Sequence, residues 1–176
     1  MIRTIIVPTD GSDHAAKAID LAADLGQKYG ARIVVLHVLL SDASPTQIKA
    51  LTAGLDIPQG VRDELDRLEE LPLETSEFAG VYAPVIIPVP LEVLQPVGRA
   101  IAERARTMVR AKGAGKIDIR IVGGRAADSI LAAAEHEKAD MIVMGSRGMG
   151  DLKGLFVGSV SHKVSHLAPC TCVTVK

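Results

Sequence analysis

The sequence predicts an α/β fold, a three-layer open sandwich in which helices cover both faces of a parallel sheet. Short runs rich in Val and Ile alternate with segments of helical spacing; the runs are residues 2–9, 32–39, 116–124, 140–146 and 170–175. Strands that alternate with helices form βαβ units, which give parallel sheets. Three of these runs, at 5–7, 33–36 and 141–144, are apolar throughout. Strands covered on both faces have this composition, so the sheet is expected between two helical layers.

The helices between these strands follow from apolar spacing and end signals. Ser12 or Asp13 can cap the first, whose apolar residues recur at i, i+3, i+4 and i+7 and whose stop signal is Gly30. Later helices are expected from about Pro96 to Lys112, from Ala127 to Lys138 and over residues 159–168.

The segment 41–95 interrupts this alternation, and we interpret residues 1–176 as one domain with an insertion there. The insertion is too long for an ordinary connection between a strand and a helix. It offers a capped helix beginning near Ser44, a charged helix in PQGVRDELDRLEEL, and then an apolar stretch broken by four prolines. Prolines exclude a regular helix or a central strand over that stretch. The insertion could pack on its own domain, cover a ligand as a lid, or contact a partner protein.

Charge and hydropathy exclude several classes of protein. The 20 basic and 21 acidic residues give a net charge of -1, so no basic excess indicates nucleic-acid binding. No run approaches the roughly 18 apolar residues of a membrane helix, and the N-terminus is too polar for a signal peptide. We therefore expect a cytoplasmic protein with no membrane partner. Cys170 and Cys172 lack further ligands at metal-site spacing and are interpreted as inert.

Ligands of open parallel sheets bind at the carboxyl ends of the strands, which directs attention to the residues after each strand. Asp10 follows the first strand within PTDGS. It could cap a helix or form a turn, or its carboxylate could meet a ribose hydroxyl or a metal ion that is bound to phosphate. The sequence leaves both roles open.

The stretch GSRGMGDLKGLFVGSVSHKV, residues 145–164, is the second candidate. It matches neither a Walker A loop nor G-x-G-x-x-G, but it holds G-x2-G-x9-G-S through Gly145, Gly148, Gly158 and Ser159. Backbone N–H groups after a strand and at a helix start bind anions. The stretch is either such a phosphate site or a flexible connection. In a phosphate site, a Cβ at Gly148 or Gly158 is expected to fill the space of the phosphates.

No nucleophile and base are paired in the sequence, so binding is favoured over turnover. His37, inside the second strand, is expected in the core, and His162 is expected to be solvated or to cap a helix.

The chain resembles the universal stress protein family. The resemblance rests on IIVPTDGSDHAAKAIDLAADLG, on LHV after the second strand, and on GGRAADSILAAAEHEKADMIVMGSRG followed by GDLKGLFVGSVSHKVSHLAPCTCVTV. It implies a five-stranded, Rossmann-like sandwich of the adenine nucleotide alpha hydrolase type. It also implies binding of ATP, AMP or ADP in a stress-response regulator, with Mg²⁺ at Asp10 as an option and slow ATP hydrolysis left open. A homodimer through the C-terminal strand is implied as well.

Carried over by position, the resemblance assigns site residues. Pro8, Thr9 and Asp10 would line the adenosine, and Val38 would meet adenine through its backbone. Met144 and Gly145 would stand at the loop entry, Arg147 and Gly148 at the phosphates or ribose, and Gly158, Ser159, Val160 and Ser161 at the phosphates. Two alternatives remain: a partner-binding member whose cleft the insertion covers, and a related α/β enzyme that uses ATP, whose motifs are absent.

Overall fold

The computed structural model describes residues 1–71, 75–78, 81–84, 88–149 and 158–176. Its main sheet has five strands in the order β5-β2-β1-β6-β7, and every neighbouring pair is parallel. The strands are β1 (Thr4–Pro8), β2 (Arg32–Val38), β5 (Ile117–Val122), β6 (Met141–Gly145) and β7 (Thr171–Val175). The predicted five-stranded parallel sheet is confirmed.

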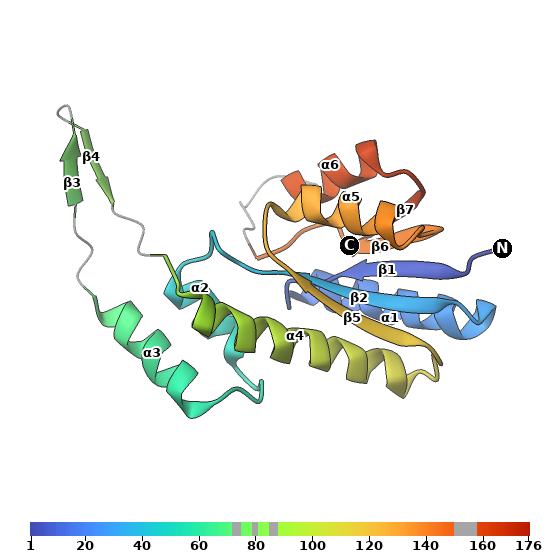
Figure 1. Ribbon diagram of the computed structural model, residues 1–176, viewed down its shortest axis with the longest axis horizontal. Coiled ribbons are helices and arrows are strands. Elements are labelled where there is room, and N and C mark those ends of the chain that lie inside the picture. The colour runs from blue at the N-terminus through green and yellow to red at the C-terminus, as the bar shows by residue number, and fades with distance from the viewer. Residues whose placement is uncertain (72–74, 79–80, 85–87, 150–157) are drawn as a thin grey trace.

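Helices cover the sheet on both faces, as expected for strands without alternation (Figure 1). One layer holds α1 (Asp13–Tyr29) and α4 (Leu91–Ala111), and the other holds α5 (Ala126–His136) and α6 (Ser159–Leu167). Ser12 is the cap of α1, since its side chain accepts from the Ala15 N–H. Gly30 ends the helix in the left-handed conformation, which glycine adopts without strain.

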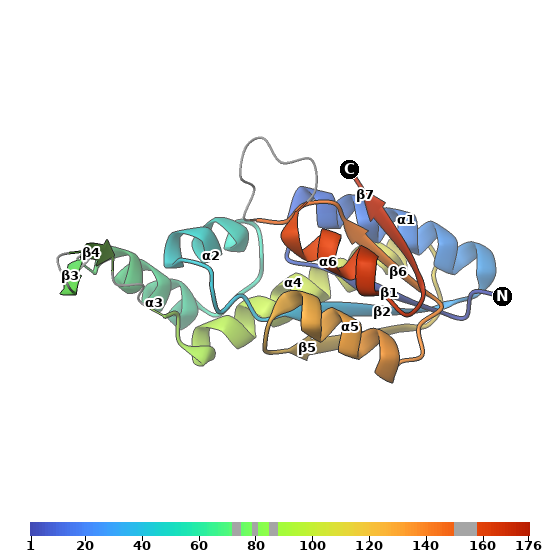
Figure 2. The ribbon, with the colours of Figure 1, turned by 90° about the horizontal axis from the view of Figure 1, so that it is seen from above.

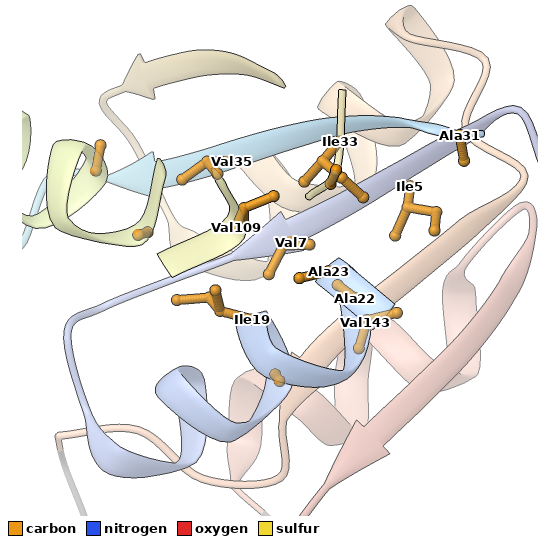
Figure 3. Packing of buried hydrophobic residues seen from close by; sticks show 14 residues of the cluster. Ile5, Val7, Ile19, Ala22, Ala23, Ala31, Ile33, Val35, Val109 and Val143 are labelled. Carbon is orange, nitrogen blue, oxygen red and sulfur yellow. The ribbon is translucent and has the colours of Figure 1, made fainter. Parts of the chain in front are cut away.

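The layer of α1 and α4 packs through small residues, which lets the helices lie close to the sheet. Ala18, Ala22 and Ala23 of α1 are fully buried against β-branched residues of the strands. Figure 3 shows Ile19, Ala22 and Ala23 of α1 on the side of the helix that faces Val7 of β1. Burial of aliphatic side chains on both faces contributes most of the stability of such a sheet, at about 25 cal/mol per Å² of apolar surface.

The insertion adds a helical unit with its own hydrophobic cluster. It holds α2 (Pro45–Thr52), α3 (Gln59–Glu70) and an antiparallel hairpin of β3 (Thr75–Phe78) and β4 (Val81–Pro84). Buried residues of α2 and α3, among them Ile48 and Leu65, pack against Val97 and Ile101 of α4. Figures 1 and 2 show the hairpin at the far end of the molecule from the main sheet.

One expectation for the insertion was wrong. Helix α4 begins at Leu91 rather than near Pro96, so this proline lies inside the helix. A proline removes one helical hydrogen bond, but Val93 and Leu94 of this first turn are buried in the insertion cluster, which favours the helical conformation. The proline-broken stretch also contains β4, which ends at Pro84, but this is an edge strand of a two-stranded hairpin, where a proline is tolerated. Both predicted insertion helices are confirmed.

No helix in the described part of the chain is long and apolar enough to cross a membrane. Cys170 and Cys172 carry free thiols and are half-buried on the α6 side of the sheet. Burial raises the pKa of the Cys170 thiol, which keeps it protonated and agrees with the expectation that it is inert.

Candidate functional site

A cavity of about 450 Å³ opens at the carboxyl ends of β1, β2 and β6. The strand order reverses between β1 and β6, and ligands of open α/β sheets bind at such a switch point. All the site residues predicted from sequence line this one cavity: Pro8, Thr9, Asp10, Val38, Met144, Gly145, Arg147, Gly148, Gly158, Ser159, Val160 and Ser161. The fold therefore brings them together, and their binding of a nucleotide stays a prediction.

Asp10 connects the loop after β1 to the loop after β6. Its Oδ1 accepts from the Ser12 N–H at 3.0 Å, which is the expected turn, and its Oδ2 accepts from the Met149 N–H at 2.9 Å. The side chain is half-buried on the cavity wall. Each oxygen keeps a further lone pair, so the carboxylate can also accept from a ribose hydroxyl or hold a cation. Asp10 can therefore form the turn with Ser12 and still contact a ligand through the same carboxylate.

The glycines of the motif are required by close approach rather than by unusual dihedral angles. None of Gly145, Gly148 and Gly158 has a positive φ. A Cβ at Gly148 would lie 2.4 Å from Asp10 Oδ2, and one at Gly145 would lie 2.8 Å from the His14 backbone carbon. At Gly158 a Cβ would be 3.3 Å from the Ser146 carbonyl oxygen. The expectation that these Cβ atoms would fill phosphate space stays a prediction, and at Gly148 a Cβ would in addition meet Asp10.

Helix α6 starts at the cavity without a side-chain cap, because its N-cap residue is Gly158. The first bond of the helix runs from His162 N–H to Gly158 C=O, so the N–H groups of Ser159, Val160 and Ser161 have no helical partner. The Ser161 hydroxyl is engaged elsewhere, at 2.7 Å from the Ser146 carbonyl that also accepts from Gly158 N–H. Ser161 therefore ties the helix start to the β6 loop and offers a ligand its backbone.

The opposite end of the cavity holds Val38, the last residue of β2. The β1–β2 ladder ends with the bond from Thr9 N–H to Leu36 C=O at 2.8 Å. In a parallel strand alternate residues point their N–H and C=O to the same neighbour, so Val38 faces the space beyond the end of β1. Among the described residues, none accepts from its N–H or donates to its C=O.

The histidines lie where the sequence predicts. His37 is buried, with 1% of its surface exposed. Its Nδ1 lies 2.9 Å from the Thr9 carbonyl, and since a carbonyl only accepts, Nδ1 carries the hydrogen. Burial lowers the pKa of His37, an effect that the Thr9 bond and nearby Asp10 offset only in part. His162 is exposed on α6.

The insertion supplies part of the cavity wall, through residues that the sequence analysis did not name. Asp42, Ala43 and Gln47 of the insertion line the cavity, together with Leu40 just before it. Gln47 belongs to a capping box, in which its Oε1 accepts from Ser44 N–H at 2.9 Å and its N–H donates to Ser44 Oγ. The helix start was visible in the sequence, and a lid over a ligand was one of the roles left open, but no signal identified which insertion residues would reach the cavity. The other unpredicted lining residues are Ala15, Leu36, Ala126, Ile130 and Met149.

The donors and charges of the cavity fit a nucleotide better than a bare metal ion. No group of three or more potential metal ligands occurs within the described ranges, so a cation there would need ligands from a bound phosphate. The α6 N–H groups suit phosphate, and Leu36, Ile130 and Met144 give an apolar surface for a base.

Comparison with known proteins shows which family this chain is similar to. The sequence model of the universal stress protein family matches residues 1–176. The chain is 31% identical, over 176 residues and the whole of both chains, to a Thermus aquaticus protein named "Universal stress protein in QAH/OAS sulfhydrylase 3′region".

Solved structures share the fold. A universal stress protein crystallised in complex with cAMP has a TM-score of 0.60 at 21% identity, covering 99% of this chain and 96% of that one. The Archaeoglobus fulgidus universal stress protein in complex with dAMP has a TM-score of 0.60 at 17% identity, covering 100% and 98%. The match of the family model over residues 1–176 establishes that this chain belongs to the universal stress protein family.

Proposed function

We propose that this chain binds an adenine nucleotide, ATP foremost, and acts as a stress-response regulator whose dimer responds to the nucleotide. The observation that carries the proposal is the pairing of two backbone sites in one cavity. Within the described ranges, the first N–H groups of α6 have no partner at one end of the cavity, and the Val38 N–H and C=O have none at the other.

The chemistry of the two ends favours adenine over guanine. Adenine presents an acceptor, N1, beside a donor, the N6 amino group, which matches one N–H and one C=O of a single residue. Guanine presents the reverse order, a donor N1–H beside the acceptor O6. Phosphates would lie at α6, where N–H groups and the helix dipole favour anions. Asp10 lies between the ends and suits the ribose hydroxyls or Mg²⁺ bound to phosphate.

Titration calorimetry with ATP, ADP, AMP, adenosine and GTP tests the proposal. We expect ATP to bind more tightly than adenosine because only ATP reaches the α6 N–H groups, and GTP to bind weakest among the triphosphates. Mass spectrometry of nucleotide released from purified protein identifies the occupant. Folded protein that gives no heat with millimolar ATP and Mg²⁺ would contradict the proposal.

The dimer would form through β7, which is an edge of the main sheet and pairs only with β6 in the described structure. An unpaired edge offers its N–H and C=O groups to a second copy. Sedimentation velocity with and without ATP measures the state. A monomer under both conditions at micromolar protein would remove the dimer from the proposal and leave nucleotide binding in place.

We propose binding rather than turnover because no histidine or cysteine is among the described residues that line the cavity. Its carboxylates are Asp10, already engaged with two backbone N–H groups, and Asp42. Efficient hydrolysis requires a group that positions and activates water. Phosphate release at less than one turnover per minute is the expected result of a standard assay.

A further inference from the structure

The end of the β1–β2 ladder departs from the regular parallel pattern in one bond. The register pairs Pro8 with Leu36, and the last regular bond runs from Thr9 N–H to Leu36 C=O. The next bond of a parallel ladder would run from Val38 N–H to Thr9 C=O. The His37 ring takes that carbonyl instead, with Nδ1 at 2.9 Å from the Thr9 oxygen.

The neighbouring bonds show which residues of β2 direct their backbone groups toward β1. Leu39 N–H donates to Val122 C=O at 2.8 Å, so residues 37 and 39 direct their backbone groups to β5. Leu36 and Val38 therefore direct theirs to β1. The side chain of His37 leaves β2 on the α4 side and returns to the Thr9 carbonyl, one bond beyond the last rung.

We infer that His37 is a positioning residue: by holding the Thr9 carbonyl toward its own ring, it keeps this oxygen away from the Val38 N–H, which stays unpaired and available to the base of a bound nucleotide. This inference rests on the proposed function, since it assigns the Val38 amide to nucleobase recognition. His37 itself is not among the residues that line the cavity, so it acts through Thr9 and Val38.

The packing around His37 fixes the ring in this role. A Cβ at Gly98 of α4 would lie 2.7 Å from His37 Cδ2 and 3.0 Å from Nε2, so the helix backbone approaches the ring edge closely. Only 1% of the residue is exposed. A ring held this tightly has little freedom to release the Thr9 carbonyl, and a neutral imidazole with its hydrogen on Nδ1 suits the buried site.

Loss of the Nδ1 donor has a specific expected consequence. The Thr9 carbonyl would become an unsatisfied buried acceptor, and the nearest backbone donor in the ladder direction is Val38 N–H. Forming that bond would extend the ladder by one rung and remove the donor that adenine N1 needs. A hydrogen bond of this kind is worth up to about tenfold in affinity.

The test compares His37→Leu, which removes the donor, with His37→Asn, whose side-chain amide places an N–H near the position of Nδ1. Each variant and the wild type are titrated with ATP and with 1-deaza-ATP, in which a C–H replaces the N1 acceptor. We expect the wild type and H37N to prefer ATP by about tenfold, and H37L to bind both ligands equally weakly. Thermal unfolding confirms that each variant is folded.

Amide hydrogen exchange at Val38 provides a readout that needs no nucleotide. The Val38 N–H should exchange faster in the wild type and H37N than in H37L, where it becomes protected by the Thr9 carbonyl. Unchanged Val38 exchange in folded H37L, or an unchanged preference for ATP over 1-deaza-ATP, would overturn the role of His37. Wild-type protein that binds no ATP would instead overturn the proposed function, while the exchange experiment would still decide whether His37 controls the Val38 amide.

Discussion

The substitution Gly148→Ala tests the contact that joins the two loops of the cavity. Gly148 has no positive φ, so the backbone accepts alanine without strain, and the effect is steric. The new Cβ would lie 2.4 Å from Asp10 Oδ2. Relief to an ordinary contact requires a shift of roughly 1 Å, which takes the 2.9 Å bond from Met149 N–H beyond the ~3.2 Å limit of a normal hydrogen bond.

The expected magnitude follows from the charge on Asp10. A hydrogen bond to a charged group contributes about 1.5–3 kcal/mol, so G148A should lower the free energy of unfolding by up to this amount. If ATP binding requires the same loop position, the dissociation constant should rise roughly tenfold to a hundredfold. Urea unfolding measures the first quantity and calorimetric titration the second.

A matched control and a double mutant make this prediction specific. Gly123→Ala is the same substitution at a site where a Cβ meets nothing within 4 Å and φ is not positive, so it should change neither quantity. In an Asp10→Ala background the obstacle is absent, and the stability penalty of G148A should nearly vanish. An equal penalty in both backgrounds would show that Asp10 is not what Gly148 makes room for.

Three further outcomes are expected. Gly145→Ala should lower the free energy of unfolding, measured in urea, by about 1–3 kcal/mol. The new Cβ would meet the backbone of His14 and Ala15, which cannot move without shifting α1. An unchanged free energy of unfolding would contradict this prediction. Acid unfolding should be less steep in Glu137→Gln. The bond from Arg32 and that from Arg120 hold the pKa of Glu137 below its ordinary value of about 4.3, so the stability it contributes is complete above that pH and is lost as pH falls through the lowered pKa. Asp42→Asn removes a negative charge from the cavity wall. It should strengthen ATP binding roughly two- to threefold at low salt and less at high salt, and leave the binding of neutral adenosine unchanged. Equal effects on both ligands would refute an electrostatic cause.

The regular part of the fold was predictable because its signals are local. Apolar runs without alternation identified β1, β2 and β6 as strands covered on both faces, and Ser12 and Gly30 marked the ends of α1. The start of α4 was not predictable in this way. Its first turn is stabilised by burial of Val93 and Leu94 against the insertion, a tertiary effect that outweighs the local preference of Pro96.

In the candidate site too, features with a local sequence signal were predictable, and features that depend on tertiary contacts were not. The glycine spacing and Asp10 placed the predicted residues around one cavity, because the carboxyl ends of parallel strands meet at one edge. The bond between Asp10 and Met149 joins residues 139 positions apart, so no local pattern could indicate it. The insertion residues of the wall could not be identified for the same reason, since Ala43 and Gln47 only flank an ordinary helix-start signal at Ser44.

The site is built mainly from backbone groups, so a shift of one loop residue at one end of the cavity can displace a backbone group at the other end. The base end depends on Thr9, whose carbonyl binds His37, and the next residue, Asp10, holds the Met149 N–H of the loop that leads toward α6. A ligand that draws Asp10 toward a ribose or a cation competes with the Met149 bond. Because Thr9 and Asp10 share one peptide unit, such a shift at the phosphate side also moves the carbonyl that keeps the Val38 amide open. If the proposed nucleotide binds, we therefore expect the loop after β1 to couple the base end of the cavity to the phosphate end.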